Sequence, residues 1–144
     1  MSISPEDYLV STDRSRLDLA WVHDRLSTDT YWAKGRTRER VEIAVANSEC
    51  YGVYHPDGHQ VAFARVVTDK VTFAWLSDVY VDRSVRGTGV SKLLVGRIVA
   101  DVESLELRRF LLATADAHGL YERFGFTPHP HPDWWMERVW ETNV

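Results

Sequence analysis

Apolar and polar residues alternate along four stretches of the chain, and this alternation is the pattern of half-buried strands. The four stretches cover residues 8–11, 50–54, 60–67 and 71–81. A His-Pro-Asp-Gly turn at 55–58 joins the second stretch to the third. We therefore expect the last three strands to form an antiparallel meander.

Apolar residues at steps of three or four predict helices elsewhere in the chain. One predicted helix covers residues 16–26, and a shorter one surrounds 41–45, where Thr37 offers an N-cap. A longer helix begins at Val90 and carries apolar positions as far as Leu105. Helices thus alternate with the strands and do not form a separate bundle.

The second half of the chain adds a strand at 109–114 and a short helix over 117–125. Further strands are expected from Phe126 and over 134–140. A strand, a long helix and another strand in that order imply a parallel pair with a right-handed crossover. The expected fold class is α/β, a mixed, mainly antiparallel sheet with helices on both faces, in one domain of residues 1–144.

Composition and charge narrow the choice of partners and compartment. The chain has 17 basic and 21 acidic residues and a net charge of −4, so no general affinity for nucleic acid is expected. Its single cysteine, Cys50, suits a reducing compartment. The chain has neither an apolar run of about 18 residues nor a signal peptide. We expect a cytoplasmic protein without a membrane partner.

The stretch 79–94 joins a strand end, a glycine turn and a helix start, and that order forms a cradle for an anion. Glycines let the backbone approach a ligand, and the first amides of a helix lack partners. Between Arg83 and Ile98 the chain carries four basic residues and no acid. We interpret the stretch as a pyrophosphate seat. The seat itself is residues Arg86, Gly87, Thr88, Gly89, Val90 and Ser91, and the strand end that leads into it is Val79, Tyr80 and Val81.

The amino-acid sequence of this turn excludes two well-known phosphate-binding motifs. A P-loop needs Lys and then Ser or Thr after its last glycine, and a dinucleotide fingerprint needs glycine where Lys92 stands. The remaining pattern, Arg86, Gly89 and Ser91, resembles the Arg-x-x-Gly-x-(Gly/Ala) acyl-CoA motif of the GNAT N-acyltransferase superfamily. Ser91 departs from the family pattern but is small. The alternative is an ordinary glycine turn before an amphipathic helix.

A second motif strengthens the resemblance. Residues 117–126 match the family's later pattern Ala-x-x-Leu-Tyr-x-x-x-Gly-Phe at every defined position. The resemblance covers residues 60–140, whereas the first third of the chain agrees in element order only. It implies a GNAT-like fold, acetyl-CoA or a similar thioester as cosubstrate, and direct acyl transfer to an amine.

Tyr121 is the candidate general acid, because a phenol with a pKa of about 10 holds its proton at neutral pH. The matching family position often hydrogen-bonds the coenzyme sulfur. The alternative is a core tyrosine beside Leu120 and Phe124. Main-chain amides of Val79 or Val81 could polarise the thioester carbonyl. That strand's grip on the pantetheine arm is implied by the resemblance.

Asp78 is the candidate base, and it could instead attract a cationic acceptor or be a solvated strand acid. His118 is a second candidate, because histidine titrates near neutrality, although an exposed helix histidine is the favoured reading. Thr114 stands where the family often has asparagine. Its hydroxyl could still hydrogen-bond the pantetheine arm, but the side chain is shorter than that of asparagine.

Three further groups carry open alternatives. Tyr31 and Trp32 either contact the acceptor or pack two helices together. A metal site at 129–133 is possible in principle, but a solvated loop is favoured and no metal is expected; its candidate ligands are His129, His131 and Asp133. A tryptophan group either forms a homodimer contact or covers the sheet; its members are Trp134, Trp135 and Trp140.

The sequence thus predicts an acetyl-CoA-dependent N-acetyltransferase that acts on a primary amine of a small molecule or peptide. Nothing around Cys50 suggests a covalent nucleophile. One alternative is an acyl-CoA sensor or interaction module without catalysis. Another is a nucleotide-binding α/β protein of a different kind.

Overall fold

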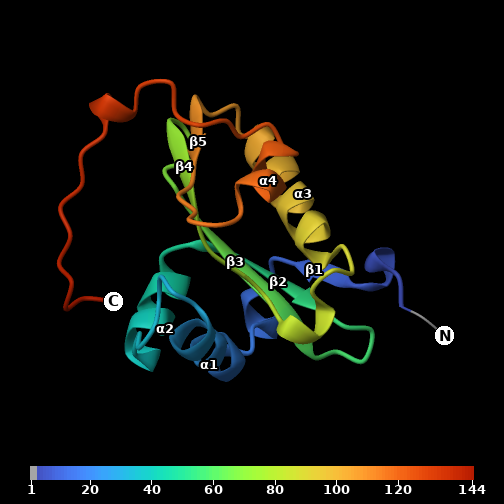
Figure 1. Ribbon diagram of the computed structural model, residues 1–144. Helices are drawn as coiled ribbons and strands as arrows, with labels where there is room; N and C mark the ends of the chain where they lie inside the picture. Colours follow the sequence, from blue (N-terminus) through green and yellow to red (C-terminus); the bar gives the residue numbers. More distant parts are fainter. Residues whose placement is uncertain (1–2) are drawn as a thin grey trace.

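A computed structural model of the protein describes residues 3–144 and contains one five-stranded sheet in the order β1-β2-β3-β4-β5 (Figure 1). The first four strands are antiparallel neighbours, and β5 runs parallel to β4. The predicted mixed, mainly antiparallel sheet is confirmed. The strands are β1 (Leu9–Ser11), β2 (Glu49–Tyr54), β3 (Gln60–Thr68), β4 (Phe73–Val81) and β5 (Arg109–Leu111).

The helices are α1 (Leu19–Asp29), α2 (Arg38–Ala46), α3 (Val90–Glu103) and α4 (His118–Glu122). Four single turns of 3-10 helix accompany them: η1 (Pro5–Asp7), η2 (Arg14–Arg16), η3 (Arg83–Val85) and η4 (Pro132–Trp134). The first helix begins later than predicted, because Asp18 caps it by accepting a hydrogen bond from Trp21 N–H. The long helix ends before Leu105, which is 38% exposed.

Helices cover both faces of the sheet, as predicted (Figure 1). On one face α3 packs its apolar side against β2, β3 and β4, with Leu94, Val95 and Ile98 fully buried. On the other face α1 and α2 bury Val22 and Val41 against the sheet. The two faces therefore have separate hydrophobic cores.

An extra residue in β4 divides that strand into two halves. Between two fixed points of the pairing, β3 advances from Phe63 to Arg65 while β4 runs from Tyr80 to Ser77, so β4 holds one residue more. Asp78 lies in this bulge with a left-handed φ of 53°. Leu76 belongs to the α3 core, whereas Tyr80, four residues on, belongs to the α1–α2 core. In a regular strand these two side chains would point to the same face of the sheet. The bulge therefore reverses which side chains of β4 point to each face.

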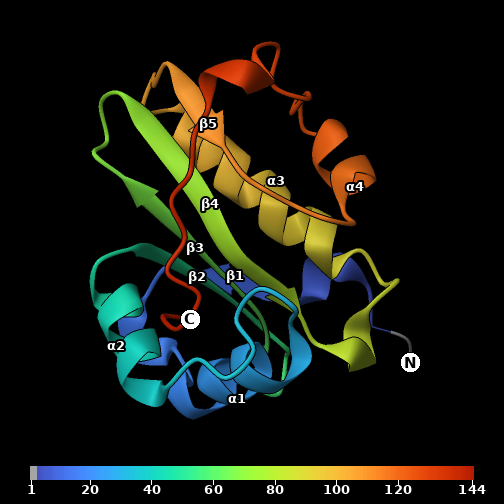
Figure 2. The same cartoon turned by 60° about the vertical axis from the view of Figure 1, so that its left-hand side comes forward.

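The strands predicted from Phe126 and over 134–140 are wrong for the single chain. Within residues 3–144 the chain forms no strand after β5, and it continues through η4 as an extended segment (Figures 1 and 2). Phe126 instead packs its ring against Phe110, with ring centroids 5.1 Å apart. The prolines at 128, 130 and 132 withhold main-chain donors from any ladder there.

Crossing a lipid bilayer takes about 20 apolar residues in one helix. No helix within residues 3–144 has that combination of length and apolar character.

Candidate active site

The turn before α3 presents a row of free main-chain donors. The first hydrogen bond of the helix runs from Leu93 N–H to the Gly89 carbonyl. From Gly87 to Lys92, no main-chain N–H donates to another group within residues 3–144. Six adjacent donors at a helix N-terminus form a site suited to an anion. That these donors hold a pyrophosphate stays a prediction.

Glycine is required at the centre of this turn. Gly87 and Gly89 have φ values of 80° and 95°, which L-residues with a side chain rarely adopt. A Cβ at Gly89 would also lie 2.9 Å from Pro5 Cγ of η1. Gly89 thus lets the backbone turn and lets η1 pack against it.

The basic residues of the cradle are partly neutralised inside the protein. The Asp29 carboxylate at the end of α1 accepts hydrogen bonds from the Arg83 guanidinium and from the Tyr80 hydroxyl, the latter at 2.5 Å. Hydrogen bonds from Arg83 and then Tyr80 hold the pKa of Asp29 well below its usual range. Arg86 Nη2 lies 3.5 Å from Asp29. These contacts tie α1 to the cradle, a link that sequence did not reveal.

A groove of about 760 Å³ leads from the cradle along β4. It exists because β4 and β5 pair over only three residues and then separate (Figures 1 and 2). Asp82 N–H donates to the Val61 carbonyl of β3. Main-chain groups of successive strand residues point to opposite sides, so the N–H and C=O of Val81 point away from β3, toward the edge of β4 that β5 leaves unpaired. Arg86 Nε confirms that direction by donating to the Val81 carbonyl over 2.9 Å.

Tyr121 of α4 lines the same groove. Its side chain is 8% exposed, and its hydroxyl has no hydrogen-bond partner among residues 3–144. Burial raises the pKa of Tyr121 to about 12, with smaller contributions from Tyr31 and Asp116. The hydroxyl therefore stays protonated throughout the neutral range and is free to donate.

Asp78 lies at the groove but is not free to act as a base. Its side chain is 1% exposed and accepts from Arg65 Nε at 2.6 Å and Arg36 Nη1 at 2.7 Å. Trp32 Nε1 donates to the other carboxylate oxygen at 2.8 Å. Burial alone would raise the pKa of Asp78, but Arg65 and Arg36 outweigh it and lower the pKa. The geometry argues against the predicted base role and favours a positioning role.

Other predicted residues divide between two cavities. Thr114 lines the groove, and its hydroxyl accepts from Ala117 N–H at 3.0 Å at the start of α4. Tyr31 and Trp32 line the same groove, and Tyr31 Oη accepts from Ala115 N–H at 2.8 Å. His118 instead lines a second cavity beside β5.

The residues weighed for a metal do not converge. His129 Nε2 accepts from Trp135 Nε1 at 2.7 Å, and His131 stacks on Trp134 with centroids 3.8 Å apart. Both histidines are thus held by aromatic partners.

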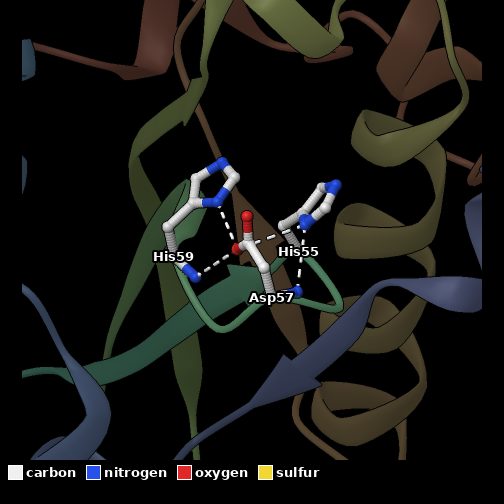
Figure 3. A group of neighbouring side chains, drawn as sticks. All are labelled: His55, Asp57 and His59. Atoms are coloured by element: carbon white, nitrogen blue, oxygen red, sulfur yellow. Dashed lines mark hydrogen bonds and ion pairs between the residues drawn. The ribbon is translucent and has the colours of Figure 1, made fainter.

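A different trio lies close together in the β2–β3 turn. Figure 3 shows His55 and His59 turned toward Asp57, with Asp57 N–H donating to His55 Nδ1 over 3.0 Å. His59 N–H also donates to Asp57 Oδ1 over 3.0 Å. These hydrogen bonds close the turn, which lies apart from the groove.

Comparison with known proteins fits this geometry. The model of the acetyltransferase (GNAT) family matches residues 17–126. The chain belongs to the GNAT acetyltransferase family. A Xanthomonas campestris pv. campestris structure described as a member of the GNAT family is 50% identical, with a TM-score of 0.88 over 92% of each chain.

Two further relatives are informative. A Gibberella zeae protein named as an acetyltransferase is 29% identical over 134 residues, which cover 80% of this chain and 76% of that protein. A Mycobacterium tuberculosis structure in complex with CoA is 21% identical, with a TM-score of 0.69 over 83% of this chain and 71% of that one. At that identity the likeness shows the fold.

The sequence of this GNAT domain did not reveal which arginines pair with Asp78 and Asp29. Arg36 and Arg65 lie 42 and 13 residues from Asp78, and Asp29 lies 54 residues from Arg83. Basic residues at such separations carry no local pattern, so only the fold brings them to the carboxylates.

Proposed function

We propose that this GNAT domain transfers an acetyl group from acetyl-CoA directly to the primary amine of a small molecule or peptide. The observation that supports this proposal is that one groove joins two kinds of donor. Free main-chain N–H groups from Gly87 to Lys92 lie at one end, and the unpaired Tyr121 hydroxyl lies along it.

The cradle fits a diphosphate by its chemistry. Its N–H groups point outward from a helix start, where the helix dipole also favours negative charge. Arg86, Gly87, Thr88, Gly89, Val90 and Ser91 form this cradle in our proposal. Val79, Tyr80 and Val81 line the groove beyond it, where the open edge of β4 offers main-chain groups to an extended arm.

Acetyl-CoA, when bound, supplies an acyl group activated as a thioester. Tyr121 Oη would hold the proton that the departing sulfur needs, and its pKa of about 12 keeps that proton in place until then. The main-chain N–H of Val79 or Val81 would donate to the carbonyl oxygen. Thr114 would contact the arm from the opposite wall.

The acceptor side of the groove is aromatic. Tyr31, Trp32 and Trp75 line it, and the Tyr31 and Trp32 rings meet edge to face with centroids 5.0 Å apart. Asp78 holds Trp32 through its indole nitrogen and so positions this wall. We assign the amine to this side because the cradle lies at the other end of the groove. A free, buried Cys50 thiol, whose pKa burial raises to about 11, accords with a cytoplasmic location and with direct transfer.

The decisive experiment measures binding and turnover separately. Acetyl-CoA should raise the melting temperature, because a ligand of the folded state stabilises it. CoA thiol should then be released when a panel of primary amines is added. Binding without thiol release from any amine would favour the acyl-CoA sensor, and no thermal shift at millimolar acetyl-CoA would refute the cradle. ATP serves as the competitor that tests a nucleotide site.

A further inference from the structure

Three side chains of metal-binding types meet at the turn between β2 and β3. His55, Asp57 and His59 alternate over five residues, and each offers one ligand atom within 4.8 Å of the other two (Figure 3). His55 Nδ1 lies 3.2 Å from Asp57 Oδ1, and His59 Nδ1 contacts the same oxygen. Two imidazole nitrogens therefore converge on one carboxylate oxygen.

The spacing of these atoms is close to what a bound ion requires. Zinc binds imidazole nitrogen and carboxylate oxygen at about 2.0–2.2 Å, which places two ligands of a tetrahedral site about 3.3 Å apart. The separation of 3.2 Å between His55 Nδ1 and Asp57 Oδ1 already agrees with that value. The side chains of Asp57 and His59 are both 58% exposed, so small rotations can adjust the other separations.

The turn fixes the direction of the ligands before any ion binds. His55 N–H donates to the His59 carbonyl at 2.9 Å, and Gly58 N–H donates to the His55 carbonyl at 2.8 Å. Gly58 permits this turn because its φ is 102°. The His55 ring also meets the buried Tyr8 ring edge to face, with centroids 5.8 Å apart. Binding an ion here would therefore order fewer side chains than binding it in a flexible loop.

The Asp57 carboxylate is available to a cation. No lysine or arginine within residues 3–144 pairs with it, in contrast to Asp29 and Asp78. Its contact with His59 Nδ1 needs a shared proton, because two lone pairs would repel each other. A divalent ion would take the place of this proton. His55 Nδ1 would exchange the hydrogen bond that it now accepts from Asp57 N–H at 3.0 Å for a bond to the ion.

We propose that His55, Asp57 and His59 bind one divalent transition-metal ion, with zinc as the reference ion. Imidazole suits zinc, copper and nickel, whereas magnesium and calcium take oxygen ligands. Two nitrogens and one oxygen leave a fourth position that water would occupy. None of the three residues lines the groove, so the ion would hold β2 and β3 together at their turn and take no part in acyl transfer. The sequence predicts only a turn here and no metal, so this site goes beyond that prediction.

The test uses the full chain without a histidine purification tag, in metal-free buffer. Calorimetric titration with zinc chloride should saturate at one ion per chain below millimolar zinc, and magnesium chloride should give no saturable binding. His59→Ala should weaken zinc binding about 100-fold, because losing a residue that only supports a ligand already costs about 10- to 100-fold. His131→Ala is the matched control. It removes an exposed histidine from the group at 129–133 and should leave the affinity unchanged.

A second measurement locates the ion. In NMR spectra of ¹⁵N-labelled protein, zinc should shift the Asp57 N–H signal strongly, because this group loses its bond to His55 Nδ1. The N–H signal of Val71, beyond the opposite end of β3, should stay in place. The spectrum of His59→Ala also verifies that this variant is folded, as its exposed position predicts.

Four results would overturn the proposal. The first is the absence of saturable binding up to millimolar zinc. The second is equal zinc affinity in His59→Ala and wild type. The third is a loss of affinity in His131→Ala, which would place the ion at the histidines after β5. The fourth is magnesium binding as tight as zinc binding, which would indicate a carboxylate site without the imidazoles.

Discussion

Trp32 and Asp78 are joined by a hydrogen bond of 2.8 Å from the indole Nε1 to the carboxylate Oδ1. The bond connects the loop after α1 to the bulge in β4, and two arginines complete the carboxylate's shell. One buried ionic group therefore positions both the aromatic Trp32 side of the groove and the bulge of β4.

Asp78→Asn should destabilise the protein, because Arg36 and Arg65 would lose their buried counter-charge. Breaking a buried ion pair from one side costs about 3–5 kcal/mol, and the retained amide oxygen places this variant near the lower end. Urea unfolding measures the change. Asp133→Asn is the control and should change little, because Asp133 is exposed and its carboxylate makes no hydrogen bond or ion pair within residues 3–144. A loss below about 1 kcal/mol, the net value of one neutral hydrogen bond, would contradict the assigned network.

The same carboxylate predicts a pH dependence. Its pKa is lowered by folding, so its contribution to stability is present above the unfolded value of 3.8 and is lost as pH falls through the folded pKa. The wild type should therefore lose stability below about pH 4 more steeply than Asp78→Asn. Urea midpoints between pH 6 and pH 3 provide the comparison. Parallel curves for the two proteins would show that Asp78 is not the responsible group.

Tyr121→Phe should lower kcat by about 10²- to 10⁴-fold, the usual contribution of a positioned acid. Binding of acetyl-CoA should be unchanged, because the buried ring remains and the hydroxyl has no hydrogen-bond partner among residues 3–144. Rates with a chosen amine and calorimetric binding give the two readouts. Similar turnover in both proteins would remove the acid role.

Tyr54→Phe is the matched control. The Tyr54 hydroxyl is buried without a hydrogen-bond partner among the described residues. Leaving such a group unsatisfied costs about 1–3 kcal/mol, so its removal should stabilise the protein and leave turnover unchanged. Thermal unfolding records the first effect.

Gly89→Ala should weaken acetyl-CoA binding. The φ of 95° penalises alanine by about 1–2 kcal/mol, and the new Cβ would meet Pro5. If the cradle loses about 1.4 kcal/mol of binding energy, the dissociation constant rises about tenfold. Gly119→Ala in α4 is the control, because its Cβ would have no neighbour within 4 Å. Equal affinities in both variants would contradict the placement of the diphosphate.

The sequence predicted the sheet and the cradle because both depend on local patterns. Alternation located β2, β3 and β4 to within two residues, and the glycine spacing located the turn before α3. Prediction from sequence failed for features that depend on contacts between residues far apart in the chain. The strand pattern at 134–140 is real in composition, but a strand forms only beside a free edge, and this chain presents that edge elsewhere. The partners of Asp78 could not be predicted, because Arg36 and Arg65 reach it only through the fold.

The bulge at Asp78 also constrains how this chain can vary. Removing one residue between Ser77 and Val79 would restore a regular ladder and rotate the rest of β4 by half a turn. Tyr80 would then enter the α3 core, and its hydroxyl would leave Asp29. A single-codon deletion here would thus be far more harmful than most substitutions. Alignments of distant relatives should therefore keep this position ungapped.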